Sequence, residues 1–167
     1  TVESVDWKSF AGCTALRSAR LLNGVGEIGL QAFEGCTSLE DVLVPATVTS
    51  IGDFAFAGCG KLRGILLPEA LPVHALGTFR GCASLEGVAL PDGLAEIDDR
   101  AFEGCKSLKA ISLPQSVATV GKSAFGGCSG LTRASLPDGL AKIADGAFAD
   151  CSHLAEINIP RQARVIE

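Results

Sequence analysis

Apolar and polar positions along the chain follow one pattern that repeats every 23 residues, without an insertion or deletion. A fixed period of this length indicates a repeat architecture, so it is considered before any local feature. In the clearest copy, residues 90–112, the apolar residues Ile97, Ala101, Cys105 and Leu108 recur at steps of three and four. That spacing predicts a short helical segment with one buried face.

The period of the pattern changes at the end of each copy. Ile111 and Leu113 alternate with other residues, which predicts a strand with one buried face. Pro114 then ends the strand, because proline has no N–H to donate to a ladder. Residues 94–97 are a candidate second, shorter strand on the opposite side of the coil.

Two side chains keep the same place in every copy. The phenylalanines are Phe10, Phe33, Phe56, Phe79, Phe102, Phe125 and Phe148, and the cysteines are Cys13, Cys36, Cys59, Cys82, Cys105, Cys128 and Cys151. Each unit exposes an apolar face that it cannot bury alone, so stacked units bury it and their strands form a parallel sheet. We expect phenylalanine to fill the interior and cysteine to form a column of small apolar side chains. The predicted fold is an α/β repeat solenoid, one domain over residues 1–167.

Two stretches of the repeat resemble the BspA-like, or Treponema-type, leucine-rich repeat family over the whole chain. They are L-x-x-[IV]-x-L-P at Leu108, Ile111, Leu113 and Pro114, and I-x-x-x-A-F-x-G-C at Ile97, Ala101, Phe102, Gly104 and Cys105. The resemblance implies a right-handed leucine-rich-repeat coil with a concave parallel sheet. It also implies a non-catalytic module that binds proteins, with a cell-surface or extracellular setting favoured. A parallel β-helix is the competing architecture, and the predicted helical segment argues against it.

Composition narrows the class of partner. The chain has 167 residues, a net charge of −5 and no basic cluster, which argues against binding to nucleic acid or to anionic membrane surfaces. No apolar run reaches the length of about 18 residues that indicates a membrane-spanning helix. Both ends fall in the middle of a repeat, without the polar capping repeats that solenoids use. We therefore expect a fragment of a longer protein.

The seven cysteines are expected to be reduced and structural. Their uniform spacing lacks the close pairs of a metal site, and an odd number cannot pair completely. Neighbouring coils would hold their Cβ atoms about one strand spacing apart, beyond the ~3.8 Å usual for a disulfide. Disulfides or a metal are the alternatives. A glycine precedes each cysteine except the last, where Asp150 stands, and this position is expected to take a left-handed conformation that ends the helical segment.

Residues for catalysis are scarce. His153 lies at a variable, exposed position, and His74 falls in the most irregular copy, where a local distortion explains it better than a ligand. No nucleophile, base and orienting group can be assembled into a reaction centre. The sequence therefore predicts no enzyme, no cofactor and no metal site.

Variable positions on the predicted strands are the candidate partner contacts. They are Leu43, Leu66, Gly64, Gly87 and Ala89, flanked by Glu40, Arg63 and Glu86. An apolar strip with a charged rim is typical of a protein contact site, although scattered apolar residues are common on any surface. Two functions fit: a recognition module of adhesin or surface-protein type, or a rigid structural subunit of a larger organellar or cytoplasmic assembly. The identity of the protein partner does not follow from the residues.

Overall fold

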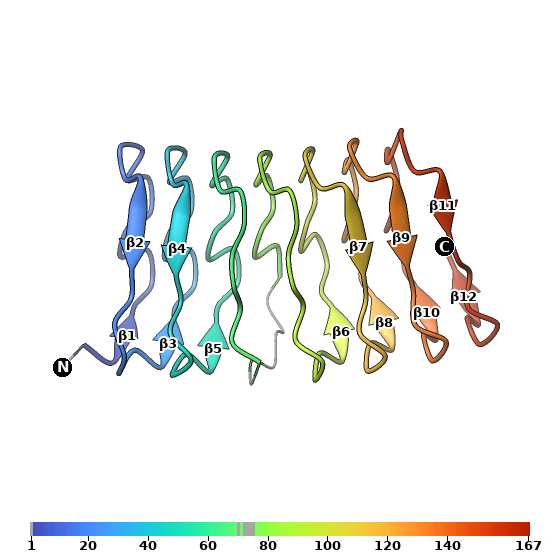
Figure 1. Ribbon diagram of the computed structural model, residues 1–167, viewed down its shortest axis with the longest axis horizontal. Helices are drawn as coiled ribbons and strands as arrows, with labels where there is room; N and C mark the ends of the chain where they lie inside the picture. Colours follow the sequence, from blue (N-terminus) through green and yellow to red (C-terminus); the bar gives the residue numbers. More distant parts are fainter. Residues whose placement is uncertain (1, 70, 72–75) are drawn as a thin grey trace.

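The computed structural model describes residues 2–69, 71 and 76–167. The chain winds into coils that stand side by side along the long axis, with the two termini towards opposite ends (Figure 1). Every strand pairing is parallel and joins residues 23 apart, such as Val42 with Ala19 and Ile143 with Val120. The repeat period therefore sets the register of the whole solenoid.

The predicted strand is confirmed after five of the seven repeat leucines, whereas the residues after Leu62 and Leu85 form only an isolated bridge. These strands are β2 (Ser18–Arg20), β4 (Asp41–Leu43), β7 (Ala110–Ser112), β9 (Arg133–Ser135) and β11 (Glu156–Ile157). β2 pairs with β4, β9 lies between β7 and β11, and an isolated bridge joins Leu66 to Ala89 in the middle. We call the outward side of this ladder the sheet face.

The second, shorter strand is also confirmed, and residues 94–97 contain β6 (Glu96–Ile97). The other members are β1 (Ser4–Val5), β3 (Glu27–Ile28), β5 (Ser50–Ile51), β8 (Thr119–Val120), β10 (Lys142–Ile143) and β12 (Val165–Ile166). They form a three-stranded sheet, β1-β3-β5, and a four-stranded sheet, β12-β10-β8-β6. Figure 1 shows these strands below the sheet-face strands.

The predicted helical segment is wrong, because the described residues contain no helix. In its place the N–H of Phe33 donates to the carbonyl oxygen of Ala55 in the next coil, at 2.8 Å, and the N–H of Glu34 donates back to Gln31, at 3.1 Å. Gln31 and Gly35 have φ values of 56° and 71°, and a left-handed residue interrupts a right-handed helix. The steps of three and four thus come from successive turns. We call this side of the solenoid the turn face.

The fold class is therefore a parallel β-solenoid whose repeats carry no helix in the described part of the chain. Because the described residues contain no helix, the helical segment no longer distinguishes this fold from a parallel β-helix. The right hand of the coil and the concavity of the sheet stay predictions. His74, in the irregular copy, lies outside the described residues, so the distortion expected there also stays a prediction.

The phenylalanine and cysteine columns form the interior as expected. Neighbouring phenylalanine rings stack with centroids 5.1 to 5.8 Å apart and interplanar angles of 2° to 17°. The five inner cysteines are fully buried, and one apolar core runs along the solenoid. At the ends, Phe10 is 40% exposed, Cys13 is exposed and Cys151 is half-buried, because each lacks a neighbouring coil on one side.

Candidate interaction surface

The sheet face has two outward positions for each inward one. In β4 the side chain of Val42 is buried, whereas Asp41 and Leu43 on either side of it are exposed. The same order recurs around Ile65, where Gly64 and Leu66 are exposed. This alternation follows from the pleat of a strand, which sends successive side chains to opposite faces.

Two large apolar side chains lie next to each other on this face. Leu43 is 51% exposed and Leu66 is 76% exposed, at the same position of neighbouring coils. Arg20 precedes them in register with Leu43, and Ala89 follows them by its bridge to Leu66. We call Arg20, Leu43, Leu66 and Ala89 the leucine row.

Gly64 and Gly87 lie beside the leucine row and are exposed. A Cβ atom at either glycine would meet no other atom within 4 Å, and neither residue has a positive φ. The fold itself therefore does not require glycine at these positions. Gly64 and Gly87 lie two residues before the bridged Leu66 and Ala89, outside the named strands, and a glycine beside a sheet leaves room for another chain to approach closely.

Charges alternate along the edge of the face. Glu40, Arg63 and Glu86 are exposed as predicted, and Arg17 and Lys109 extend their line, so that the signs run plus, minus, plus, minus, plus. We call these five residues the charged row. The N–H of Glu40 donates to Arg17 O at 2.8 Å, which shows that members of the row lie on adjacent coils.

The charged row is not paired within the described chain. Among the described residues, none of its five members forms an ion pair within 4.0 Å, although Arg133 Nε and Glu156 Oε2 on the same sheet lie 2.7 Å apart. The sequence analysis missed Arg17 and Lys109. Reading the residue after each repeat leucine, from one copy to the next, reveals both.

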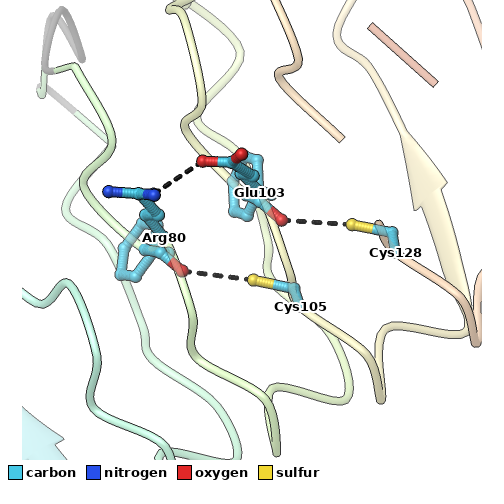
Figure 2. A network of polar contacts seen from close by, with 6 residues as sticks. Arg80, Glu103, Cys105 and Cys128 are labelled. Carbon is cyan, nitrogen blue, oxygen red and sulfur yellow. Dashed lines mark hydrogen bonds and ion pairs between the residues drawn. The ribbon is translucent and has the colours of Figure 1, made fainter. Parts of the chain in front are cut away.

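The turn face carries a hollow of about 530 Å³ that the sequence analysis also missed. Gln31, Glu34, Phe54 and Arg80 line it, at positions that vary between copies. Its charged groups already have partners, since Gln31 Nε2 donates to Glu34 Oε2 at 2.6 Å and Arg80 Nε lies 2.6 Å from Glu103 Oε2. Figure 2 shows the second of these pairs.

The five inner cysteines, Cys36, Cys59, Cys82, Cys105 and Cys128, are buried and unreactive. Cys105 Sγ and Cys128 Sγ donate to carbonyl oxygens of the preceding coil, of Phe79 at 3.2 Å and Phe102 at 3.1 Å (Figure 2). Burial raises the pKa of the Cys128 thiol to about 12, so it stays neutral and unreactive at neutral pH. All seven cysteines are free.

Histidines and acidic clusters add no reaction centre in the part of the chain that the structure describes. His153 is exposed, as expected, and its Nδ1 lies 2.6 Å from Ser129 O. The described residues contain no group of three or more His, Cys, Asp or Glu side chains placed to hold a metal ion. They also contain no helix with the length and apolar character needed to cross a membrane.

The stacked coils, the phenylalanine interior and the exposed sheet define a leucine-rich repeat scaffold, a class that is typically non-catalytic. The chain belongs to the family described as BspA type leucine rich repeat region, whose pattern matches six copies over residues 1–77 and 75–167. The resemblance inferred from the repeat stretches is thereby confirmed. No curated protein matches the chain.

Solved structures of bacterial proteins share the fold. A leucine-rich repeat protein of T. pallidum is 32% identical with a TM-score of 0.63, over 96% of this chain and 64% of that one. A leucine-rich cell surface protein of Faecalibacterium prausnitzii is 20% identical with a TM-score of 0.56, over 92% and 62%. The pneumococcal vaccine antigen PcpA is 21% identical with a TM-score of 0.68, over 97% and 49%. The chain thus spans less than two thirds of the length of each.

Proposed function

We propose that this chain is a non-catalytic scaffold that binds another protein through its sheet face, as a recognition module of surface-protein type. The observation that carries the proposal is the adjacent pair Leu43 and Leu66, two large apolar side chains that are exposed on neighbouring coils of the sheet face. Neither leucine contributes to the core, so the solenoid gains nothing from an apolar side chain at these positions.

The surroundings of the two leucines support the same function. The charged row gives a polar rim on one side, which is the usual composition of a protein contact site. Gly64 and Gly87 leave open space between the rim and the leucines. The setting at a cell surface is supported by relatives of this fold, one of which is described as a cell surface protein and another as a vaccine antigen.

Two matched double variants test the proposal. Leu43→Glu with Leu66→Glu places charges on the leucine row, whereas Ser112→Glu with Ser135→Glu places them on exposed positions of β7 and β9. All four sites are exposed, so both variants should keep the circular dichroism spectrum and melting temperature of the parent chain. Each protein is then cross-linked in an extract of its native source, and the captured proteins are identified by mass spectrometry.

We expect the leucine variant to lose a protein that the parent chain and the serine variant both capture. Full retention of every captured protein by the leucine variant would remove the sheet face from consideration. Size separation of the gently extracted native protein distinguishes the alternative role. A protein that runs at its own mass or with one small partner fits a recognition module, whereas a large, stable particle indicates a structural subunit.

A further inference from the structure

The alternating signs of the charged row restrict what can lie on the sheet face. We number the coils by this row, so that coils one to five carry Arg17, Glu40, Arg63, Glu86 and Lys109. These exposed charges are left without ion-pair partners within the described chain. A surface that repeats the same alternation in the opposite phase would pair with all of them.

A second copy of the chain provides such a surface if the two sheets pack face to face. With a two-fold axis parallel to the strands, the charged row of one copy faces the charged row of the other, and the leucine row faces the leucine row. The coils of the two copies then run in opposite directions. A two-fold axis along the solenoid would instead place the charged row against the leucine row, which leaves charges facing apolar side chains.

The charges decide where the axis crosses the solenoid. An axis through a coil places like charges together. With the axis at the third coil, for example, Arg63 faces Arg63 of the second copy, and Glu40 faces Glu86. An axis between two coils places opposite charges together wherever both copies carry a charge of the row. In an isologous dimer of this kind each contact occurs twice, once in each direction.

The leucine row then selects one of the remaining positions of the two-fold axis. An axis between the second and third coils sets Leu43 of each copy against Leu66 of the other. The same axis pairs Glu40 with Arg63 and Arg17 with Glu86, so the charged row of these four coils is matched. Moving the axis on by one coil keeps the charges matched but sets Leu43 against Ser112. Two independent rows therefore agree on a single arrangement.

The geometry points to a homodimer in which the partner of the sheet face is a second copy of this chain, related by a two-fold axis between the coils of Leu43 and Leu66. This inference rests on the proposed function, because it assigns a partner to the same surface. Gly64 and Gly87 face Asp41 and Ser18 of the second copy, and the open space above both glycines lets the two sheets approach closely.

The expected dimer is weak. Four coils at a strand spacing of about 4.8 Å span about 19 Å, and the face is only about five residues, or roughly 17 Å, wide. Such an area falls below the ~1,200 Å² of total buried surface found in standard-size interfaces. The charged row lies at the rim, so association should weaken as salt rises and screens it.

Charge exchange tests this arrangement by sedimentation velocity. The parent chain is measured from about 10 µM to about 1 mM at low salt, a range suited to a weak interface. Glu40→Lys alone sets two positive charges against each other in both inner contacts of the dimer, and Arg63→Glu alone sets two negative charges against each other there. Lys106→Glu is the matched control, since Lys106 is exposed, forms no ion pair with the described residues and lies in the turn before the charged row and β7. Circular dichroism checks that every variant is folded.

We expect the parent chain and the Lys106→Glu control to form a concentration-dependent dimer, and each single variant to remain monomeric. An equimolar mixture of the Glu40→Lys and Arg63→Glu proteins should form a heterodimer, because both of its inner contacts then join opposite charges. A chain that carries both substitutions should dimerise again.

A parent chain that stays monomeric up to about 1 mM overturns the inference, as does a mixture that fails to associate. These results test the homodimer and leave the proposed function to its own experiment. If the parent chain is monomeric but the Leu43→Glu, Leu66→Glu variant still loses a cross-linked protein of another kind, the sheet face binds that protein and only the homodimer is wrong.

Discussion

The thiol of Cys82 donates a hydrogen bond to the carbonyl oxygen of Phe56 in the preceding coil, with an Sγ–O distance of 3.2 Å. The same oxygen accepts the N–H of Cys59 at 3.1 Å, so both of its acceptor sites are used although it lies in the interior. A buried carbonyl without partners would be costly. Cysteine at this position therefore fills a small space and satisfies a backbone group with one side chain.

Removal of this thiol should destabilise the solenoid. We expect Cys82→Ala to lower the free energy of unfolding by about 1–2 kcal/mol, from one neutral hydrogen bond and a small cavity. Cys151→Ala is the matched control, because Cys151 makes the same bond to Phe125, at 3.2 Å, but is only half-buried. Urea unfolding followed by circular dichroism gives both values, and equal losses would contradict the importance of burial.

Stability should fall at alkaline pH because of the buried thiols. Burial raises the pKa of Cys59 and of Cys128 from the ordinary 9.0 to about 12. Between these values the unfolded chain releases the thiol protons while the folded chain keeps them, so rising pH favours unfolding. Each thiol should remove about 1.4 kcal/mol per pH unit above pH 9, and nothing below it.

The contribution of one thiol can be isolated by comparison. Urea unfolding of the parent chain and of Cys59→Ala, between about pH 8 and pH 11 with a reductant present, should show a shallower decline for the variant. The groups that titrate on the surface are common to both proteins and cancel in the difference. Parallel declines would show that this thiol titrates normally in the folded chain.

The backbone conformation of the turn face predicts how substitutions to and from glycine change the stability of the fold. The residue two before each core phenylalanine is left-handed, and its φ is 58° at Arg100, 60° at Gly77 and 61° at Gly146. Arg100→Gly should raise the free energy of unfolding by up to about 1 kcal/mol, because relief of the left-handed strain is partly offset by the entropy of glycine in the unfolded chain. Thermal unfolding measures the change.

The reverse substitutions separate backbone strain from collision. Gly146→Ala introduces a Cβ that has room, with its nearest atoms 3.6 Å away, so it should cost about 1 kcal/mol from strain alone. Gly77→Ala should cost clearly more, because its Cβ would collide with the ring of Phe54 in the preceding coil. The prediction fails if Gly77→Ala is the milder of the two.

Neighbouring residues Phe79 and Arg80 should differ sharply in their contribution to stability. Phe79 is 2% exposed and stacks on rings on both sides, so Phe79→Ala should cost about 3–5 kcal/mol. Arg80 pairs with Glu103, as Figure 2 shows, but the pair is partly exposed, so Arg80→Ala should cost less than about 1 kcal/mol. The loss from Arg80→Ala should vanish in high salt, and a salt-independent loss would contradict this account.

The repeat itself determined most of the fold. A strict step of 23 residues places Phe33 beside Phe56 and Val42 beside Ala19, so the core, both strands of the coil and their register followed without knowledge of the structure. The exposure of Leu43 and Leu66 followed for the same reason, because alternation along a strand decides which side chains point outward.

Only the tertiary structure decided where the backbone hydrogen bonds of the turn face go. The spacing of Ala32, Phe33 and Cys36 suits a helix as well as a series of turns. In the structure the N–H of Phe33 donates a hydrogen bond to the carbonyl oxygen of Ala55 in the next coil. That acceptor lies one coil further along the chain, so no local pattern can reveal it. The same holds for the charged row: its alternation is written in the sequence, but its lack of ion pairs with the described residues depends on where the side chains of adjacent coils lie.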